Sequence, residues 1–347
     1  MTTQDAGAIP VIRAVREEDF PQIHALAQLT GGGMTNLPRD RDALFSRIAF
    51  ALESFDAKAS EPGGENYILV LDRGGDILGT AGIFSAIGLE SGFVNYRINT
   101  MFHFSDQLGK RISRRILVPT HDFTGTSEVA SLFLSPDARG GGFGKLLARS
   151  RYLFVAQTPH LFADRMCAEL RGWRDDQGGQ PFWAAVGRHF FDMDFESADQ
   201  HNSRAGNQFI ADLMPIYPIY VAVLPEAAQA CIGKPHASAR PAYEMLIREG
   251  FEFTGYVDVF DGGPLVEAKV SAIKTVRDSQ AATGAVGDVP AGTKTMLLAA
   301  GEGKNFRCIR EPAQMAVDGD TRHITITAQS AEALKVEAGA PIRAIAW

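Results

Sequence analysis

The chain has 347 residues, 34 Lys and Arg against 41 Asp and Glu, and a formal net charge of −7. This negative charge argues against a nucleic-acid-binding protein, and no apolar run approaches the roughly 18 residues of a membrane-spanning helix. The first ten residues lack the basic start and apolar core of a secretion signal. We therefore expect a cytoplasmic globular protein, long enough for more than one domain.

The cysteines do not predict a metal site or a disulfide framework. Cys167, Cys231 and Cys308 are odd in number, far apart and without zinc-ligand spacing. Three reduced thiols are the expectation, and no tightly bound metal or cofactor is predicted.

The first part of the chain predicts strands and helices in alternation. A short strand covers 11–15, and the acidic turn Glu17–Asp19 opens a helix that runs toward Leu29. A polar, glycine-rich loop at 30–38 follows, and Thr30–Thr35 within it is a candidate lid. The further predicted elements are a helix at about 40–55, a hairpin of strands 67–71 and 77–84, and strands at 94–104 and 114–118.

A strand, a glycine-rich turn and a helix then follow one another without a break. Residues 129–134 are apolar, Ser135-Pro136-Asp137 ends the strand, and Arg139-Gly-Gly-Gly-Phe-Gly144 leads into a helix at 145–155. Glycines expose backbone N–H groups, and the N-terminus of the helix adds unpaired donors and a positive dipole. This arrangement predicts a cradle for an anionic group.

Other phosphate-binding motifs fit this loop poorly. A P-loop needs Ser or Thr after Gly-Lys, but Leu146 follows Lys145. A dinucleotide fingerprint needs Gly-x-Gly-x-x-Gly with an acidic residue about 20 positions later. The spacing Arg139-x-x-Gly142-x-Gly144 instead resembles the acyl-CoA loop of the GNAT N-acyltransferases, which holds the CoA pyrophosphate.

The second half of the chain repeats the alternation. Its predicted elements are a strand at 164–170, helices at 181–190, 226–231 and 240–248, and strands at 216–224, 252–260 and 264–271. Residues 278–294 are small, polar and glycine-rich, which predicts a linker. Short alternating runs at 295–299, 322–327 and 341–347 predict a small β module.

The expected fold is α/β (α+β), a GNAT-like mixed sheet flanked by helices, with the β module at its C-terminal end. We divide the chain into an acyl-CoA-binding domain at 1–200, a second GNAT-like segment at 201–277, a linker at 278–294 and the β module at 295–347.

Several longer stretches resemble the arginine N-succinyltransferase family, including its arginine/ornithine-specific subunits. They include VIRAVREEDF, HDFTGTSEVASLFLSPDAR, PFWAAVGRHFFDMDF and GFEFTGYVDVFDGGP, and they fall in order over about residues 10–275. The resemblance implies succinyl-CoA as co-substrate and the α-amine of L-arginine as acceptor. It also implies a succinyl-CoA contact at Leu132 and a proton donor at His236, although the sequence around this histidine departs from the family pattern.

The remaining site residues are hypotheses from the chemistry of acyl transfer. Leu134, Arg139, Gly140, Gly141, Gly142 and Gly144 are expected to join Leu132 in binding CoA. Glu128 is the candidate base, with Glu169 as its rival. Arg97 is a candidate for the succinyl carboxylate, and Asp258 and Asp261 are candidates for the guanidinium of arginine.

Two alternatives stay open at this point. The acceptor can be ornithine or another amine, since arginine and ornithine share the same α-amino acid group. The chain can also be a non-catalytic subunit that supports a paralogous active one, and a homo- or hetero-oligomer is expected in either case.

Overall fold

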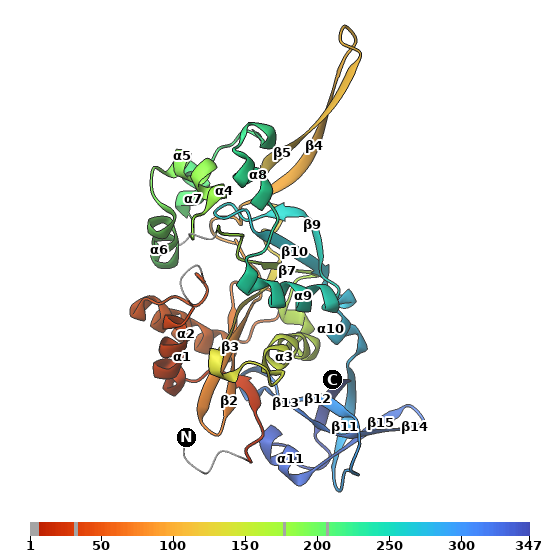
Figure 1. The fold of residues 1–347 in the computed structure, drawn as a ribbon. Coiled ribbons are helices and arrows are strands. Elements are labelled where there is room, and N and C mark those ends of the chain that lie inside the picture. Colours follow the sequence, from red (N-terminus) through yellow and green to blue (C-terminus); the bar gives the residue numbers. More distant parts are fainter. Residues whose placement is uncertain (1–6, 31–33, 176–177, 206–207) are drawn as a thin grey trace.

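The computed structural model describes residues 7–30, 34–175, 178–205 and 208–347. The predicted lid, Thr30–Thr35, includes Gly31–Gly33, which lie outside the described residues. Figure 1 shows a long sheet with a projecting hairpin at one end and the C-terminal strands at the other.

Strands form most of the framework. They are β1 (Val11–Ala14), β2 (Asn66–Arg73), β3 (Asp76–Phe84), β4 (Asn95–Ser105), β5 (Lys110–Thr120), β6 (Ser127–Leu134), β7 (Arg165–Glu169), β8 (Ile219–Tyr220), β9 (Glu252–Val257), β10 (Pro264–Lys269), β11 (Gln280–Val286), β12 (Thr295–Ala300), β13 (Arg307–Pro312), β14 (Gln314–Asp318), β15 (Thr321–Ile326) and β16 (Pro341–Ala346). Within the described ranges they form one mixed sheet in the order β14-β15-β11-β16-β12-β13-β1-β2-β3-β6-β7-β10-β9-β4-β5-β8.

Helices pack against this sheet. They are α1 (Phe20–Gln28), α2 (Arg41–Asp56), α3 (Phe143–Gln157), α4 (Pro181–Ala185), α5 (Gly187–Phe191), α6 (Phe195–Ala205), α7 (Gln208–Leu213), α8 (Glu226–Cys231), α9 (Arg240–Glu249), α10 (Lys274–Asp278) and α11 (Ala328–Leu334). Short 3₁₀ turns include η2 (Pro136–Ala138) and η5 (Ala237–Ala239). No helix among the described residues is long and apolar enough to cross a membrane.

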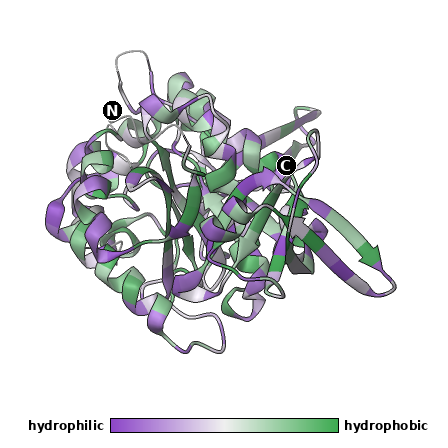
Figure 2. Cartoon of the chain, turned by 90° about the horizontal axis from the view of Figure 1, so that it is seen from below, coloured by the Kyte–Doolittle hydropathy of each residue, from purple (hydrophilic) through white to green (hydrophobic). Residues whose placement is uncertain are grey.

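An aromatic cluster joins the helices to the centre of the sheet. The ring of Tyr67 on β2 lies 5.2 Å from both Phe55 of α2 and Phe154 of α3, and 5.9 Å from Phe162. Such tilted and edge-to-face pairs add to the stability gained by burying the rings. Figure 2 shows the apolar segments on the central strands and the polar ones mostly on the outer helices. This core fixes α3 against β2, β3 and β6.

The β4–β5 hairpin is a long arm. Its two strands pair from Asn95↔Thr120 to Ser105↔Lys110, and β8 adds only two further pairs near its base, at Ile116 and Leu117. The arm projects from the rest of the molecule (Figure 1). Phe102 is 81% exposed and Leu108 is 70% exposed, so its outer part leaves apolar side chains uncovered.

The predicted linker at 278–294 is wrong over 280–286, where the chain forms a strand. Residues 280–286 form β11, which pairs with β15 in parallel and with β16 in antiparallel. The small residues serve close packing instead of flexibility: a Cβ on Gly284 would lie 2.8 Å from Cδ1 of Ile342. Only 287–294 connects β11 to β12 without a strand or helix.

Two other segments differ from the predicted elements. The helix expected at 181–190 is broken into α4 and α5 at Val186, whose φ of −125° and ψ of −75° are not helical, and Gly187 approaches the ring of Trp183 so closely that a Cβ would clash. The strand expected at 216–224 is reduced to β8, since Pro218 cannot donate a ladder hydrogen bond and a 3₁₀ turn covers Val221–Val223.

Candidate functional site: a divergence between two strands

The parallel strands β6 and β7 separate after two pairs of residues. Ser127 pairs with Met166 and Glu128 with Cys167. Beyond this point β6 continues along β3 as far as Leu134, while β7 continues along β10. From Val129 onward, no described strand pairs with the β7-facing edge of β6.

A β-bulge shapes the open part of β6. Ser131 and Leu132 together lie opposite Ala81 of β3, and Ser131 has a φ of 51°, a conformation that non-glycine residues rarely adopt. The hydroxyl of Ser131 donates to the carbonyl of Asn36 at 2.9 Å, and its carbonyl accepts from Thr80 Oγ1 at 3.0 Å. These two bonds hold the strained residue in place.

The backbone of Leu132 and Leu134 faces the opening. The N–H of Ser135 donates to Leu78 on β3 at 2.8 Å. Because successive residues of a strand direct their backbone groups to opposite edges, those of Leu134 and Leu132 point away from β3. The leucine side chains pack against the main core. An extended ligand can therefore pair with this main chain.

The glycine loop connects the open edge to the N-terminus of α3. Gly140 and Gly142 have φ values of 96° and 77°, which explains why glycine occupies both positions. The first hydrogen bond of the helix runs from Leu146 N to Gly142 O at 3.0 Å. The N–H groups of Phe143, Gly144 and Lys145 thus precede the helical ladder and can donate to an anion. Gly141 and Arg139 are exposed beside them.

Glu128 lies at the point where the strands separate. It is only 4% exposed, and burial raises its pKa from 4.5 to about 7. The guanidiniums of Arg47 and Arg151 act in the opposite direction and favour the carboxylate. A carboxyl group with a pKa near neutrality is suited to proton transfer.

A second cluster of buried carboxyls comprises Glu169, at the end of β7, and Asp258 and Asp261 in the β9–β10 turn. Burial raises the pKa of Glu169 well above its usual range and that of Asp258 to about 8, and it also raises the pKa of Asp261. Asp258 Oδ1 accepts the N–H groups of Phe260 and Asp261, and the two oxygens of Asp261 accept those of Gly172 and Gly263. Asp258 and Asp261 thus hold the β9–β10 turn together.

His236 is linked through the backbone to the turn that Asp258 and Asp261 hold together. Its backbone N–H donates to Arg171 O at 2.8 Å, next to Gly172, which binds Asp261. Its Nδ1 accepts from the N–H of Ser238 at 3.1 Å, so the neutral ring carries its proton on Nε2. Burial and the Arg171 guanidinium lower its pKa.

Arg97 lies on β4, farther along the sheet. Its guanidinium is exposed and lies over the ring of Tyr256 at 5.5 Å, and Tyr256 donates its hydroxyl to Asp122 at 2.7 Å. Glu128, the open edge of β6 and the glycine loop therefore follow one another along the chain, and His236 lies next to the Asp258–Asp261 turn. Arg97 instead contacts Tyr256, which binds Asp122.

The three cysteines are free and buried. Burial raises the pKa of each thiol, so none is set up as a thiolate nucleophile.

The sequence alone missed two contacts of the glycine loop. Arg310 Nη1 donates to Gly141 O at 2.9 Å, although 169 positions separate the two residues. Lys145 Nζ lies 4.1 Å from the centre of the Trp347 ring. No local pattern marks Arg310 or Trp347, because their proximity to the loop comes from the pairing of strands far apart in the chain.

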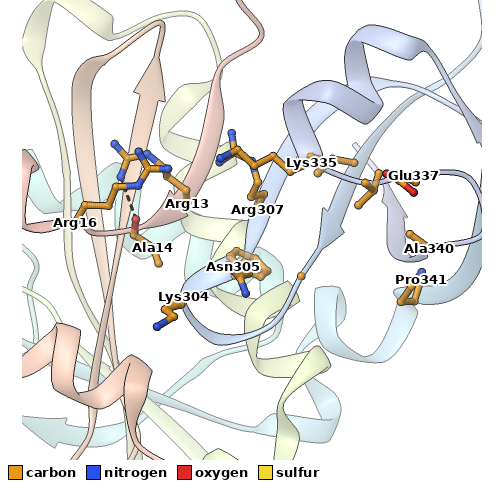
Figure 3. A pocket seen from close by; sticks show the side chains of 14 residues that line it. Arg13, Ala14, Arg16, Lys304, Asn305, Arg307, Lys335, Glu337, Ala340 and Pro341 are labelled. Carbon is orange, nitrogen blue, oxygen red and sulfur yellow. Dashed lines mark hydrogen bonds between the residues drawn. The ribbon is translucent and has the colours of Figure 1, made fainter.

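A separate cavity of about 400 Å³ lies between β1 and the C-terminal strands (Figure 3). Its basic residues are Arg13, Arg16, Lys304, Arg307 and Lys335. Most of these cations form ion pairs: Arg13 with Asp19 and Asp72, Lys304 with Asp56, and Arg16 with Glu18. The carboxyl side chain of Glu337 also lines the cavity. The cavity therefore offers little net charge for an anionic substrate.

Comparisons with known proteins agree along the whole chain. The family model described as arginine N-succinyltransferase beta subunit matches residues 10–275, and the model of its C-terminal domain matches residues 277–346. The arginine N-succinyltransferase subunit beta of Pseudomonas aeruginosa is 38% identical over 96% of this chain and 97% of that protein. The arginine N-succinyltransferase of Citrobacter koseri is also 38% identical, over the same shares.

A solved structure is similar throughout. The arginine/ornithine succinyltransferase subunit AI from Pseudomonas aeruginosa has a TM-score of 0.87 and 33% identity, and the match covers 98% of this chain and 99% of that one. The predicted fold class, a mixed sheet flanked by helices, is confirmed. Together, the matching family models and these relatives show that the chain belongs to the arginine N-succinyltransferase family.

Proposed function

We propose that this protein transfers the succinyl group of succinyl-CoA to the α-amine of L-arginine. The observation that carries the proposal is the open edge of β6, which leads directly into the glycine loop and the N-terminus of α3. The pantetheine amides of CoA can pair with Leu132 and Leu134, while its pyrophosphate takes the N–H groups of residues 140–144. Relatives named arginine N-succinyltransferase support arginine as the acceptor.

The proposed reaction is a direct attack in a ternary complex. Glu128 accepts a proton from the ammonium, and the free amine attacks the thioester carbon. The carbonyl π electrons move to oxygen, where a backbone N–H of the open edge stabilises the oxyanion. The nitrogen of the intermediate gives its second proton to solvent, and the intermediate collapses with loss of the CoA thiolate, which takes a proton from the imidazolium form of His236. An amide and free CoA result, and solvent restores both side chains.

The absence of a poised thiolate among the described cysteines supports this direct route over an acyl-enzyme. Cys167 is the cysteine nearest the divergence, paired with Glu128, and the adjacent carboxylates raise its pKa further. A neutral thiol is a poor nucleophile toward a thioester.

We also propose how the acceptor is bound. Asp258 and Asp261 use their oxygens within the β9–β10 turn, so they act on the arginine guanidinium through their charge instead of a bidentate pair. A cation bound near them would lower their raised pKa values, and arginine binding would then release protons. Arg97 remains the proposed partner of the succinyl carboxylate.

We propose an oligomer, homomeric or formed with a paralogous subunit. Two relatives carry the names subunit alpha and subunit beta. The exposed apolar side chains of the β4–β5 arm favour such assembly, because a long two-stranded hairpin with uncovered phenylalanines is marginal in water.

Ornithine is the second candidate acceptor, since the similar solved structure is named for both amino acids. Steady-state release of free thiol by the purified chain, with succinyl-CoA or acetyl-CoA against arginine and ornithine, tests the proposal. The highest kcat/KM is expected for succinyl-CoA with arginine. Turnover that appears only after a paralogous chain is added would instead identify a non-catalytic subunit.

A further inference from the structure

The C-terminal strands are fastened to the helix that follows the glycine loop. Arg149 of α3 donates from Nη1 to Ala346 O at 3.0 Å, and from Nε to Thr275 Oγ1 at 3.0 Å. It also pairs with Glu249 at 3.2 Å, with both side chains buried. β16 is thereby held against α3, and the residue after it, Trp347, comes to lie beside the loop.

Arg310 of β13 contacts the glycine loop at Gly141 and at the start of α3. Besides the bond from its Nη1 to Gly141 O, its guanidinium lies 5.9 Å from the ring of Phe143, the first residue of α3. A Cβ on Gly142 would lie 2.6 Å from Arg310 Nη1 and 3.3 Å from Trp347 Cζ2. Glycine suits this position because of its left-handed backbone, and any other residue would also displace the Arg310 guanidinium.

Trp347 holds two cations at the loop. Arg310 lies 5.0 Å and Lys145 lies 4.1 Å from the centre of its ring. Cation–π contacts offset part of the cost of bringing like charges together. Burial lowers the pKa of Lys145, and the nearby charges of Arg149, Lys274 and Arg248 lower it further. Positive charge accumulates here in a chain whose net charge is −7.

We propose that the C-terminal module completes the acyl-CoA site, with Arg310 and Trp347 positioning the glycine loop and Lys145 for the phosphates of the coenzyme. Arg310 fixes the carbonyl of Gly141 so that the adjacent N–H groups stay directed outward. Trp347 keeps Lys145 beside them, and the repulsion between the two cations is relieved when a polyanion binds. This inference rests on the proposed function, because it assumes that the loop holds CoA.

The test compares three variants in acyl transfer. Arg310→Gln removes the charge, Arg310→Lys retains it, and Arg322→Gln removes an exposed charge from β15 of the same module as a control. Arg310→Gln should raise the KM for succinyl-CoA about tenfold while kcat and the KM for arginine stay within about twofold. Arg310→Lys should recover much of the affinity, and Arg322→Gln should match the unmodified protein.

Fluorescence gives a readout that needs no turnover. CoA titrated into the protein should change its tryptophan emission, and Trp347→Phe should remove most of that change while Trp173 and Trp183 remain. The inference is overturned if Arg310→Gln leaves the KM for succinyl-CoA unchanged. It is also overturned if kcat and both KM values shift together with a lowered Tm, because that result indicates a merely structural contact.

A variant of the loop itself separates this inference from the proposed function. Gly144 has an ordinary φ and open space, since a Cβ would meet only Leu134 Cδ2 at 4.0 Å. Gly144→Asp should weaken CoA binding by charge repulsion, and Gly144→Asn should do so much less. If Gly144→Asp binds CoA poorly while Arg310→Gln binds normally, only the role of the module is wrong. Normal binding by both variants would contradict the proposed cradle as well.

Discussion

Replacing Glu128 with Gln should remove both a catalytic base and a pH-dependent cost to stability. Burial raises the pKa of Glu128 from 4.5 to about 7. Since one pKa unit corresponds to 1.36 kcal/mol, ionising this buried group costs about 3 kcal/mol more than ionising it in the unfolded chain. The glutamine variant keeps the shape of the side chain without this cost.

The sign of the stability effect follows from the raised pKa. The folded state keeps the proton between pH 4.5 and about 7, whereas the unfolded chain loses it, so this contribution to stability is present below pH 4.5 and is lost as pH rises through about 7. Urea unfolding at pH 5 and pH 8.5 measures it. From pH 5 to pH 8.5, the free energy of unfolding of the unmodified protein should fall by up to about 3 kcal/mol more than that of Glu128→Gln.

The activity of the same variant tests the base. kcat/KM of the unmodified enzyme should rise with pH through an apparent pKa near 7, the value of Glu128. Glu128→Gln should lower kcat/KM about 10²–10⁴-fold and abolish this rise. Glu169→Gln, on the neighbouring strand, serves as the matched control and should retain it. A full rise in Glu128→Gln, or its loss in Glu169→Gln, would refute the assignment of the base.

Three further predictions concern other parts of the proposed mechanism. His236→Ala should lower kcat about 10²-fold or more with little change in CoA affinity, and an unchanged kcat would remove this residue from the reaction. Arginine binding should release protons near Asp258 and Asp261, so the calorimetric enthalpy should depend on the ionisation enthalpy of the buffer; equal enthalpies in phosphate and Tris would contradict this. Phe102→Ser combined with Phe104→Ser should reduce the mass found by light scattering, while Phe45→Ser, a similarly exposed phenylalanine away from the arm, should leave it unchanged.

Local patterns predicted the parts of the site that neighbouring residues determine. The strand, the Ser-Pro-Asp turn, the glycines and the helix start are contiguous, and β6, η2 and α3 appear where the sequence places them. The β2–β3 hairpin is equally local, because Gly74 and Gly75 form its turn with φ values of 65° and 99°.

Features that depend on distant pairing could not be predicted in this way. The divergence of β6 from β7 requires the registers of both strands, and the bulge at Ser131 shows only in the pairing with β3. The glycine-rich composition of 278–294 indicated flexibility. In the structure, position 284 of β11 instead requires a glycine, because the side chain of Ile342 leaves no room for a Cβ. For β6 and for 278–294 alike, the local sequence is compatible with more than one structure, and the distant strands that pair with each segment decide which one forms.

The same distinction between local pattern and distant contact separates the site residues that could be predicted from those that could not. The loop glycines could be assigned from their spacing, whereas Asp258 and Asp261 appeared available for a substrate but bind backbone N–H groups of their own turn. Arg310 and Trp347 carried no signal, since nothing in a run of β-module residues indicates contact with a loop 169 positions away.

A structure of the complex with succinyl-CoA would test the whole account most directly. The pyrophosphate should lie within hydrogen-bonding distance of the N–H groups of residues 140–144, with the pantetheine along Leu132 and Leu134 and the thioester next to Glu128. Succinyl-CoA bound elsewhere, with the open edge of β6 and the glycine loop facing only water, would contradict it.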